Sequence, residues 1–546
     1  MIGSTSSQIV LALAVVALAY LVRFMVKFHF HRTRMSGLPG PPHSYLWGHI
    51  KSIREAMATL PLTAHRQLMP LISKEKFGLG DVFYLDTFPF APPPLVITDI
   101  EVMKSITTYT SLPKHHLVVE FVDWLGGPQN LVTLEGSAWK RWRSAFNPGF
   151  SAKHIMSLVP VIVDETQVFC DLMTEKAKKQ ELFRMERAAT KLTVDIIGKV
   201  VLDVAFDSQR GPNTLVDSML SFIKWMEIGN AWMNPIAILD IRGSFVLRYQ
   251  SWKMNRYLSR IVEDRFATRH TRQKSKAIID LALDVYIKET KGIDTTHLDP
   301  DFKTAAISNM KIFIFAGHDT TSTGIAYALY YLFKYPDILA KIRKEHDDVF
   351  GSDPADAANQ LREDPYLLNK LIYTTAVIRE VLRYQPPAST LRAGQKDVYI
   401  RDPKTGQALP TEGTMLWPLD VGIHRNEKYW PNPHVFDPER HLASASSENN
   451  STVNNKEAWI PFSNGPRNCI GQELAMVETK ILLALTVRTF DFVAAFDEAY
   501  KLNDDGSGYK VDNSSVQSIY GDEAYQVAFM TAKPRDGLPC RLTLRV

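Results

Sequence analysis

The sequence predicts a mainly α-helical fold with small β-sheets (α+β), built as one large unit behind an N-terminal transmembrane helix. Long segments carry apolar residues at the spacing of an α-helix, among them 155–173, 191–205 and 371–384. Shorter runs have the composition of strands: 81–88, 92–99, 397–402 and 525–534. No repeat of fixed period occurs, and no break in composition divides the body into independent domains.

The composition is that of a folded globular protein with room for a large core. Hydrophobic residues make up 45% and charged residues 22% of the 546 positions. The net charge of +4 is too small to indicate a nucleic-acid-binding surface, so we expect no nucleic-acid partner. The three cysteines are sparse and odd in number, which argues against a disulfide framework and suits a reducing compartment.

Residues 1–36 are predicted to form a membrane anchor with a basic flank. The apolar run 9–22 continues at 24–26 beyond Arg23, whose long side chain can reach the headgroups. The positive charges follow the apolar run instead of preceding it, which argues against a cleaved signal peptide. By the positive-inside rule, the chain after the anchor stays in the cytosol. The proline-rich segment 37–42 is expected to be a stiff hinge to a body that spans 43–546.

The segment 307–336 predicts one long, mostly buried helix with a polar centre at 316–321 (AGHDTT). Glycine costs about 1 kcal/mol relative to alanine in a helix, so such a departure indicates function. Gly317 is expected to admit a flat group close to the backbone. Thr320 is expected to bond to the carbonyl one turn earlier, and Asp319 to share a water-lined groove with it and relay protons.

A second interpretation of this segment stays open, namely a kinked core helix whose polar groups are all satisfied. His318 is expected to be structural, because no second metal ligand lies four residues on.

The stretch 462–471 (FSNGPRNCIG) places a lone cysteine, Cys469, just before an amphipathic helix. A small buried hydrophobic residue is one explanation. The alternative is a metal ligand, because a helix N-terminus favours the thiolate. No CxxC or HExxH partner occurs, which argues against zinc. A single thiolate suits a metal that a porphyrin already holds.

The residues around the cysteine fit this second explanation. Gly465 and Gly471 permit tight turns and close approach of a ligand. Arg467 offers a fixed cation to a carboxylate, and Phe462 is placed to shield the sulfur from water.

These motifs resemble those of the cytochrome P-450 family, the haem-thiolate monooxygenases. Residues 462–471 match every fixed position of the family signature Phe-x-x-Gly-x-Arg-x-Cys-x-Gly, and 316–321 resemble its oxygen-activation motif. Three further motifs follow the family's order along the chain. They are Trp-x-x-x-Arg at Trp139 and Arg143, Glu-x-x-Arg at Glu380 and Arg383, and the partner arginine Arg440, after which this chain has His441 where the family more often has Phe or Trp.

The resemblance implies roles for these residues. Cys469 would ligate the iron of haem b, Asp319 and Thr320 would deliver protons to bound oxygen, and 43–546 would be the catalytic domain. Glu380, Arg383 and Arg440 would form a buried charged network that supports the cysteine loop. His424 is a weaker haem candidate, equally explained as a turn histidine. The other expected haem contacts are Phe462, Gly465, Arg467, Gly471, Trp139, Arg143, Arg392, Ala316 and Gly317.

The resemblance also implies partners and a location. No dinucleotide fingerprint or flavin module occurs, so electrons would come from NADPH through a separate diflavin reductase. The enzyme would be a single-pass protein of the endoplasmic reticulum membrane with a cytosolic catalytic domain, and the sequons at Asn449, Asn450 and Asn513 would be unmodified.

The substrate is expected to be a lipophilic small molecule that is oxidised with O2. The pocket would draw on the mostly apolar segments 114–136, 225–238, 315–320, 386–391 and 515–520. In its general character, the sequence resembles family members from filamentous fungi, many of which act in secondary metabolism. The alternatives are a fatty-acid or xenobiotic hydroxylase, an oxygen-independent isomerase, dehydratase or peroxygenase, and a non-catalytic haem sensor or carrier.

Overall fold

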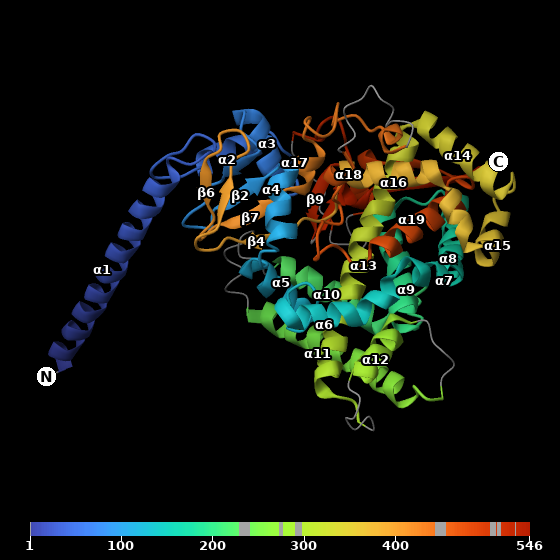
Figure 1. The fold of residues 1–546 in the computed structure, drawn as a ribbon, viewed down its shortest axis with the longest axis horizontal. Coiled ribbons are helices and arrows are strands. Elements are labelled where there is room, and N and C mark those ends of the chain that lie inside the picture. Colours follow the sequence, from blue (N-terminus) through green and yellow to red (C-terminus); the bar gives the residue numbers. More distant parts are fainter. Residues whose placement is uncertain are drawn as a thin grey trace. The chain divides into compact units, whose positions relative to one another are not determined.

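A computed structural model describes residues 2–228, 241–271, 277–289, 297–442, 455–502, 509, 515–529 and 531–545 (Figure 1). The three sequons and part of the expected pocket segment 225–238 lie outside these residues. The chain forms two compact units, and the predicted class, mainly helical with small sheets, is confirmed. Unit 1 comprises Met1–Leu60, Arg66–His115 and Thr390–Gly422, and unit 2 comprises Pro61–His65, His116–Ser389 and Ile423–Val546.

Unit 1 joins the N-terminal helix to a small mixed sheet. Its four-stranded sheet has the order β1-β2-β7-β4, in which β2 and β7 are parallel and the other neighbours antiparallel. The strands β5 and β6 form a separate hairpin. The elements are α1 (Ile2–Met35), α2 (Ile50–Met57), α3 (Leu68–Phe77), β1 (Val82–Tyr84), β2 (Pro94–Ile97), α4 (Ile100–Lys104), a π-helical turn (Ser105–Tyr109), β4 (Arg392–Ala393), β5 (Tyr399–Arg401), β6 (Ala408–Pro410) and β7 (Met415–Pro418), followed by α17 (Asp420–His424) at the boundary of the units.

The helix α1 is long and apolar enough over Leu11–Met35 to cross a membrane. Its last turns are not free for lipid, because Phe28, Arg32 and Met35 are buried within unit 1. The apolar side chains before them, such as Leu18 and Val22, are exposed. The exposed apolar stretch that could lie in a membrane therefore ends before Phe28, and the proline-rich segment 37–42 follows without helix or strand.

A buried cluster around Asp86 fixes the end of α1 to unit 1. The Asp86 carboxylate accepts hydrogen bonds from His31 and His43 at 2.9 Å each and forms an ion pair with Arg32. Arg32 also donates to the carbonyl of Phe88 at 2.7 Å. Burial alone would raise the pKa of Asp86, but the bonds from the two histidines and Arg32 outweigh it and hold the pKa well below its usual range.

The substitution Asp86→Asn is expected to loosen the end of α1, because it leaves the Arg32 guanidinium buried without its anion. Breaking such a pair costs about 3–5 kcal/mol, so we expect tryptic cleavage at Lys27 and Arg34 of the full-length protein to accelerate by about 100-fold or more. The matched control is Asp81→Asn. Asp81 pairs with Lys74 at 2.6 Å but is partly exposed, so its loss is expected to cost at most about 1 kcal/mol. Equal cleavage rates in the two variants would contradict the prediction.

Unit 2 holds the main hydrophobic core. Two small antiparallel sheets accompany its helices, with the strand orders β3-β11-β8 and β10-β9. The helices are α5 (His116–Gly126), α6 (Gly136–Phe146), α7 (Ala152–Ser157), α8 (Val159–Lys178), α9 (Met185–Ile197), α10 (Thr214–Ile228), α11 (Ile241–Ala267), α12 (Ile278–Glu289), α13 (Pro300–Lys334), α14 (Pro336–Phe350), α15 (Asp356–Glu363), α16 (Ile372–Tyr384), α18 (Asn455–Ala458) and α19 (Gln472–Thr486). The strands and short turns are β3 (Phe183–Arg184), β8 (Phe490–Ala494), β9 (Gln526–Phe529), β10 (Thr531–Pro534), β11 (Pro539–Leu544), a π-helical turn (Gly198–Leu202) and 3-10 turns at Asn147–Phe150, Pro365–Lys370, Pro438–His441, Phe496–Leu502 and Arg535–Gly537.

The long helix α13 organises unit 2. It is helical from Pro300 to Lys334 without a break, and Asp299 caps it by accepting a hydrogen bond from the amide of Asp301. Pro336 then opens the next helix, which confirms the predicted end of the segment. Most of its side chains are buried, so the exposed Ala316 near its middle stands out.

Candidate haem site

The cysteine loop is held by its own backbone. The amide of Cys469 donates to the carbonyl of Phe462 at 2.9 Å, and the amide of Asn468 donates to that of Gly465 at 3.1 Å. Gly465 has a φ of +73°, a left-handed conformation that favours glycine. The helix α19 begins directly after Gly471, whose N–H donates a hydrogen bond to the Cys469 sulfur. The thiol therefore sits at a helix N-terminus, as the sequence predicts.

Of the three cysteines, Cys469 is exposed, whereas Cys170 and Cys540 are buried. The surrounding protein nevertheless desolvates Cys469, and this burial raises its pKa against the opposing effects of the Gly471 N–H and the Arg143 charge. Cys469 can be both exposed and desolvated, because protein atoms can surround the residue and still leave a space next to its sulfur. Burial raises the pKa of Cys170 to about 12, which makes it a poor ligand.

Two of the expected haem arginines lie at the cysteine loop. Arg143 donates to both the carbonyl and the side-chain oxygen of Asn468, at 3.0 Å each. Arg467 pairs with Glu135 at 2.6 Å and lies over the ring of Trp139, 4.7 Å from its centroid. Three haem-contact candidates therefore lie together beside the thiol, namely Trp139, Arg143 and Arg467.

Arg392 belongs to unit 1. It is fully buried there, and its Nη1 donates to the carbonyl of Leu112 at 2.8 Å. Its expected haem contact stays a prediction.

The centre of α13 carries the predicted threonine bond. Thr320 Oγ1 donates to the carbonyl of Ala316 at 2.9 Å, one turn earlier. A Cβ atom at Gly317 would lie 2.9 Å from Ile197 of α9, and the expected approach of a flat group to the Gly317 backbone stays a prediction. Because Gly317 has no Cβ atom, helices α13 and α9 can pack closely at this point.

Asp319 lies in a buried ion-pair network. Its carboxylate accepts a hydrogen bond from Thr531 Oγ1 at 2.6 Å and pairs with Lys533 Nζ at 2.7 Å. Lys533 also pairs with Glu186 at 2.5 Å, and Tyr509 donates to Glu186 at 2.8 Å. The Asp319 carboxylate thus contacts strand β10, and the water-lined groove that we expected it to share with Thr320 stays a prediction.

The sequence analysis missed Glu186 and Lys533. The available signal was a lysine inside the apolar strand segment 525–534, since buried lysine is rare unless it is paired. Burial alone would lower the pKa of Lys533, but Asp319 and Glu186 raise it above its ordinary value.

Two histidines near the site have structural contacts. His318 is buried and its Nδ1 lies 2.5 Å from the carbonyl of Ile314, and burial lowers its pKa. His424 Nε2 accepts a hydrogen bond from the Ile460 amide at 3.0 Å, and burial lowers its pKa to about 3. Both contacts agree with the structural interpretation of these residues.

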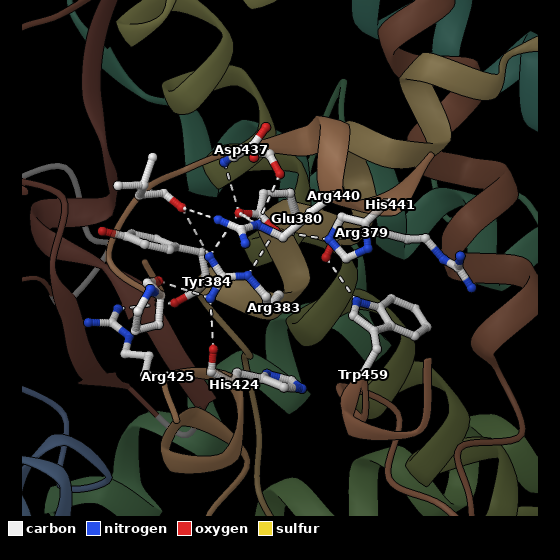
Figure 2. A network of polar contacts seen from close by, with 12 residues as sticks. Arg379, Glu380, Arg383, Tyr384, His424, Arg425, Asp437, Arg440, His441 and Trp459 are labelled. Carbon is white, nitrogen blue, oxygen red and sulfur yellow. Dashed lines mark hydrogen bonds and ion pairs between the residues drawn. The ribbon is translucent and has the colours of Figure 1, made fainter. Parts of the chain in front are cut away.

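Glu380, Arg383 and Arg440 come together in a buried network (Figure 2). Arg383 donates from Nε and Nη2 to the two oxygens of Glu380, at 2.8 Å each, and both residues are fully buried. Arg440 donates to Glu380 at 3.2 Å. Burial would raise the pKa of Glu380, but the charge and hydrogen bonds of its partners outweigh it and hold the pKa well below its usual range.

His441 is a fourth member of this network. Its Nε2 lies 2.9 Å from Glu380, so the histidine that departs from the family motif adds a polar contact that a Phe could not make. Burial lowers the pKa of His441, so the neutral ring donates this hydrogen bond near pH 7.

The network reaches the cysteine loop through short links. Arg383 donates to the carbonyl of His424 at 2.7 Å, and His424 accepts from the amide of Ile460. The carbonyl of Ile460 accepts from the amide of Ser463 at 2.8 Å, directly after Phe462. Removing the network would therefore disturb the backbone that leads to Cys469.

This donor set fits a porphyrin-held iron. It offers one accessible thiol with cationic and aromatic side chains beside it, and the described residues contain no cluster of three His, Cys, Asp or Glu side chains that could hold a metal by themselves. A metal bound at Cys469 would thus take its other ligands from a non-protein group.

Comparisons with known proteins agree with this chemistry. A sequence model of the family described as Cytochrome P450 matches residues 78–513. The cytochrome P450 monooxygenase polC of Polytolypa hystricis is 36% identical over 545 residues, which cover 98% of this chain and 96% of the relative. The cytochrome P450 monooxygenase acrF of Aspergillus aculeatus is 35% identical over 494 residues, 88% and 97% of the two chains. Cytochrome P450 4F12 of Homo sapiens is 26% identical over 526 residues, 90% and 91% of the two chains. The chain belongs to the cytochrome P450 family, as a monooxygenase with a cysteine-ligated haem.

Proposed function

We propose that this monooxygenase inserts one atom of O2 into a lipophilic small molecule in fungal secondary metabolism, by hydroxylation, epoxidation or a related oxidation. The observation that carries the proposal is the exposed Cys469 thiol, held by the Gly471 N–H at the start of α19 beside Arg143. The fungal relatives named as monooxygenases support the setting.

When bound, the haem would supply oxygen activation, and a thiolate ligand to its iron would favour O–O cleavage. In our proposal, Cys469 is that ligand, and Arg143, Arg467 and Trp139 hold the haem carboxylates from the same side. Thr320, half-buried next to the exposed Ala316, positions a proton at its Oγ1. Asp319 supplies a charge behind it that Lys533 balances.

Electrons would come from an NADPH-dependent diflavin reductase on the same membrane. The exposed apolar face of α1 supports insertion, and the basic residues after it support a cytosolic catalytic unit at the endoplasmic reticulum. The domain boundaries that we propose are 1–36 for the anchor, 37–42 for the hinge and 43–546 for the catalytic domain. The intact Asp319–Thr320 pair favours oxygen activation over an oxygen-independent isomerase.

The substitution Cys469→Ser tests the proposal. We expect the reduced, carbon-monoxide-bound protein to lose the absorption band of thiolate-ligated haem, and product formation to fall to background with a substrate found by spectral screening of lipophilic compounds. The control is Cys170→Ala, which removes a buried thiol elsewhere in unit 2 and is expected to keep the band. A Cys469→Ser variant that still forms product would overturn the proposal.

Thr320→Ala is expected to separate NADPH use from product formation. The variant lacks the hydroxyl that donates to Ala316, so product should fall by up to about 100-fold, the lower end of what a positioned proton donor contributes, while NADPH oxidation falls much less. Thr320→Ser keeps the hydroxyl and should retain most of the product per NADPH. An unchanged ratio in the alanine variant would remove Thr320 from the mechanism.

A further inference from the structure

Unit 2 contains a cavity of about 490 Å³ that none of the haem-site residues lines. It lies between α11 and α13 and is closed at one end by Gly127 and Pro128, just after α5. Its volume falls within the range of pockets that hold drug-sized molecules.

The cavity opens on a different face of α13 from the one that carries Thr320. Thr304, Ile307, Ser308 and Lys311 line it and share one stripe of the helix. Thr320 follows Lys311 by nine residues, which at about 100° per residue places it roughly 180° around the helix and about 13.5 Å along the axis. The cavity is therefore separate from the site of oxygen chemistry.

Lys311 gives this cavity a buried cation. The residue is 3% exposed and lines the cavity, and the part of the chain that the structure describes offers its ammonium no hydrogen bond or ion pair. Burial lowers its pKa to about 8. A Cβ atom on Gly127 would lie 3.9 Å from Lys311 Nζ, so the loop backbone closes over one side of the ammonium. A buried cation without an anion is costly, and a bound anion would offset that cost.

Helix α11 brings two more cations to the same space. Glu263 of α11 pairs with Lys303 of α13 at 2.6 Å. Because the cavity also takes in residues earlier in α11 and later in α13, the two helices run in opposite directions from that contact. Arg256 lies seven residues before this contact on α11, and Lys311 lies eight residues after it on α13, about 10.5 and 12 Å along the two axes, and both residues line the cavity.

The charges of the cavity are not balanced. Arg256, Arg260 and Lys311 line it, and Glu263, the one carboxylate among the described residues that line it, is already paired with Lys303 outside it. Trp252 adds an apolar wall, since its ring is 52% exposed and lies 5.3 Å from the Arg256 guanidinium. A ligand that fits needs a negative group at one end and an apolar body.

We propose that this cavity binds an amphipathic carboxylic acid, with its carboxylate on Lys311 and Arg256 and its apolar part along Trp252 and Ile307. An inorganic anion would pair with the cations but would leave the apolar side chains of the cavity exposed to water. A neutral lipophilic molecule would leave Lys311 buried without a counter-charge.

The test uses full-length holoprotein in lipid nanodiscs, titrated calorimetrically with 4-phenylbutanoate while the Soret band is recorded. We expect one binding event that leaves the Soret band unchanged. Lys311→Met and Arg256→Gln should each weaken it by about tenfold or more, since each removes a charge-assisted contact, and Lys311→Arg should retain it. Lys253→Met, which removes a charge of α11 outside the cavity, should leave the affinity unchanged.

Four outcomes would overturn the proposal. Equal affinity of 4-phenylbutan-1-ol would show that the carboxylate is not recognised. Inorganic phosphate that binds as tightly as 4-phenylbutanoate would indicate a simple anion site. A Soret shift on binding, or equal affinity in Lys311→Met, would place the ligand elsewhere. The methionine variant should fold, because it replaces a buried cation by an apolar chain of similar length.

Discussion

The variant Arg383→Ala is expected to accumulate as protein without haem. Arg383 is fully buried and donates five hydrogen bonds, two to Glu380 and three to the carbonyls of His424, Pro433 and Val435. Alanine leaves the Glu380 charge buried with weaker partners, at a cost of about 3–5 kcal/mol. It also frees the His424 segment, which holds the amide of Ile460 ahead of the cysteine loop.

The measurement is haem per protein after purification, by pyridine haemochrome against total protein. Arg383→Lys restores the charge but not the forked geometry, so we expect partial occupancy. His441→Phe is the matched control within the network. It removes one hydrogen bond from a neutral ring to the Glu380 carboxylate while the Arg383 fork remains, so it should cost about 1.5–3 kcal/mol, less than the loss of Arg383, and keep the haem. Normal haem content in Arg383→Ala would refute the role of the network.

Local patterns in the sequence carried much of the fold and of the candidate site. The helical spacing of apolar residues predicted α13 and its end at Pro336, because the contacts that form a helix join residues close together in the sequence. The loop before Cys469 is equally local, with its bonds from Gly465 to Asn468 and from Phe462 to Cys469. The helix that is apolar enough to cross a membrane also follows from a local pattern, the apolar run 9–22 with its continuation beyond Arg23.

Contacts between distant segments were not accessible in the same way. A hydrophobic pattern shows that 525–534 holds strands, but it does not show that Lys533 meets Asp319. The close packing of Gly317 against Ile197 depends on a residue of another helix, so no local pattern predicted it. The contact of His441 with Glu380 likewise depends on tertiary structure.

The variant Lys533→Met is expected to destabilise unit 2 strongly. Lys533 is 4% exposed and lies between the carboxylates of Asp319 and Glu186, at 2.7 and 2.5 Å. Without the ammonium, two buried carboxylates face each other with only hydroxyl donors such as Thr531 and Tyr509, at a cost of about 3–5 kcal/mol. The denaturant midpoint of the holoprotein, followed by Soret absorbance, should fall accordingly.

Glu186→Gln separates this ion-pair effect from loss of packing. In the double variant with Lys533→Met, one carboxylate is gone, so the second substitution should cost less than it does in the native background. The double-mutant cycle should give a coupling free energy of about 1–3 kcal/mol. Purely additive losses would mean that Lys533 contributes by packing alone.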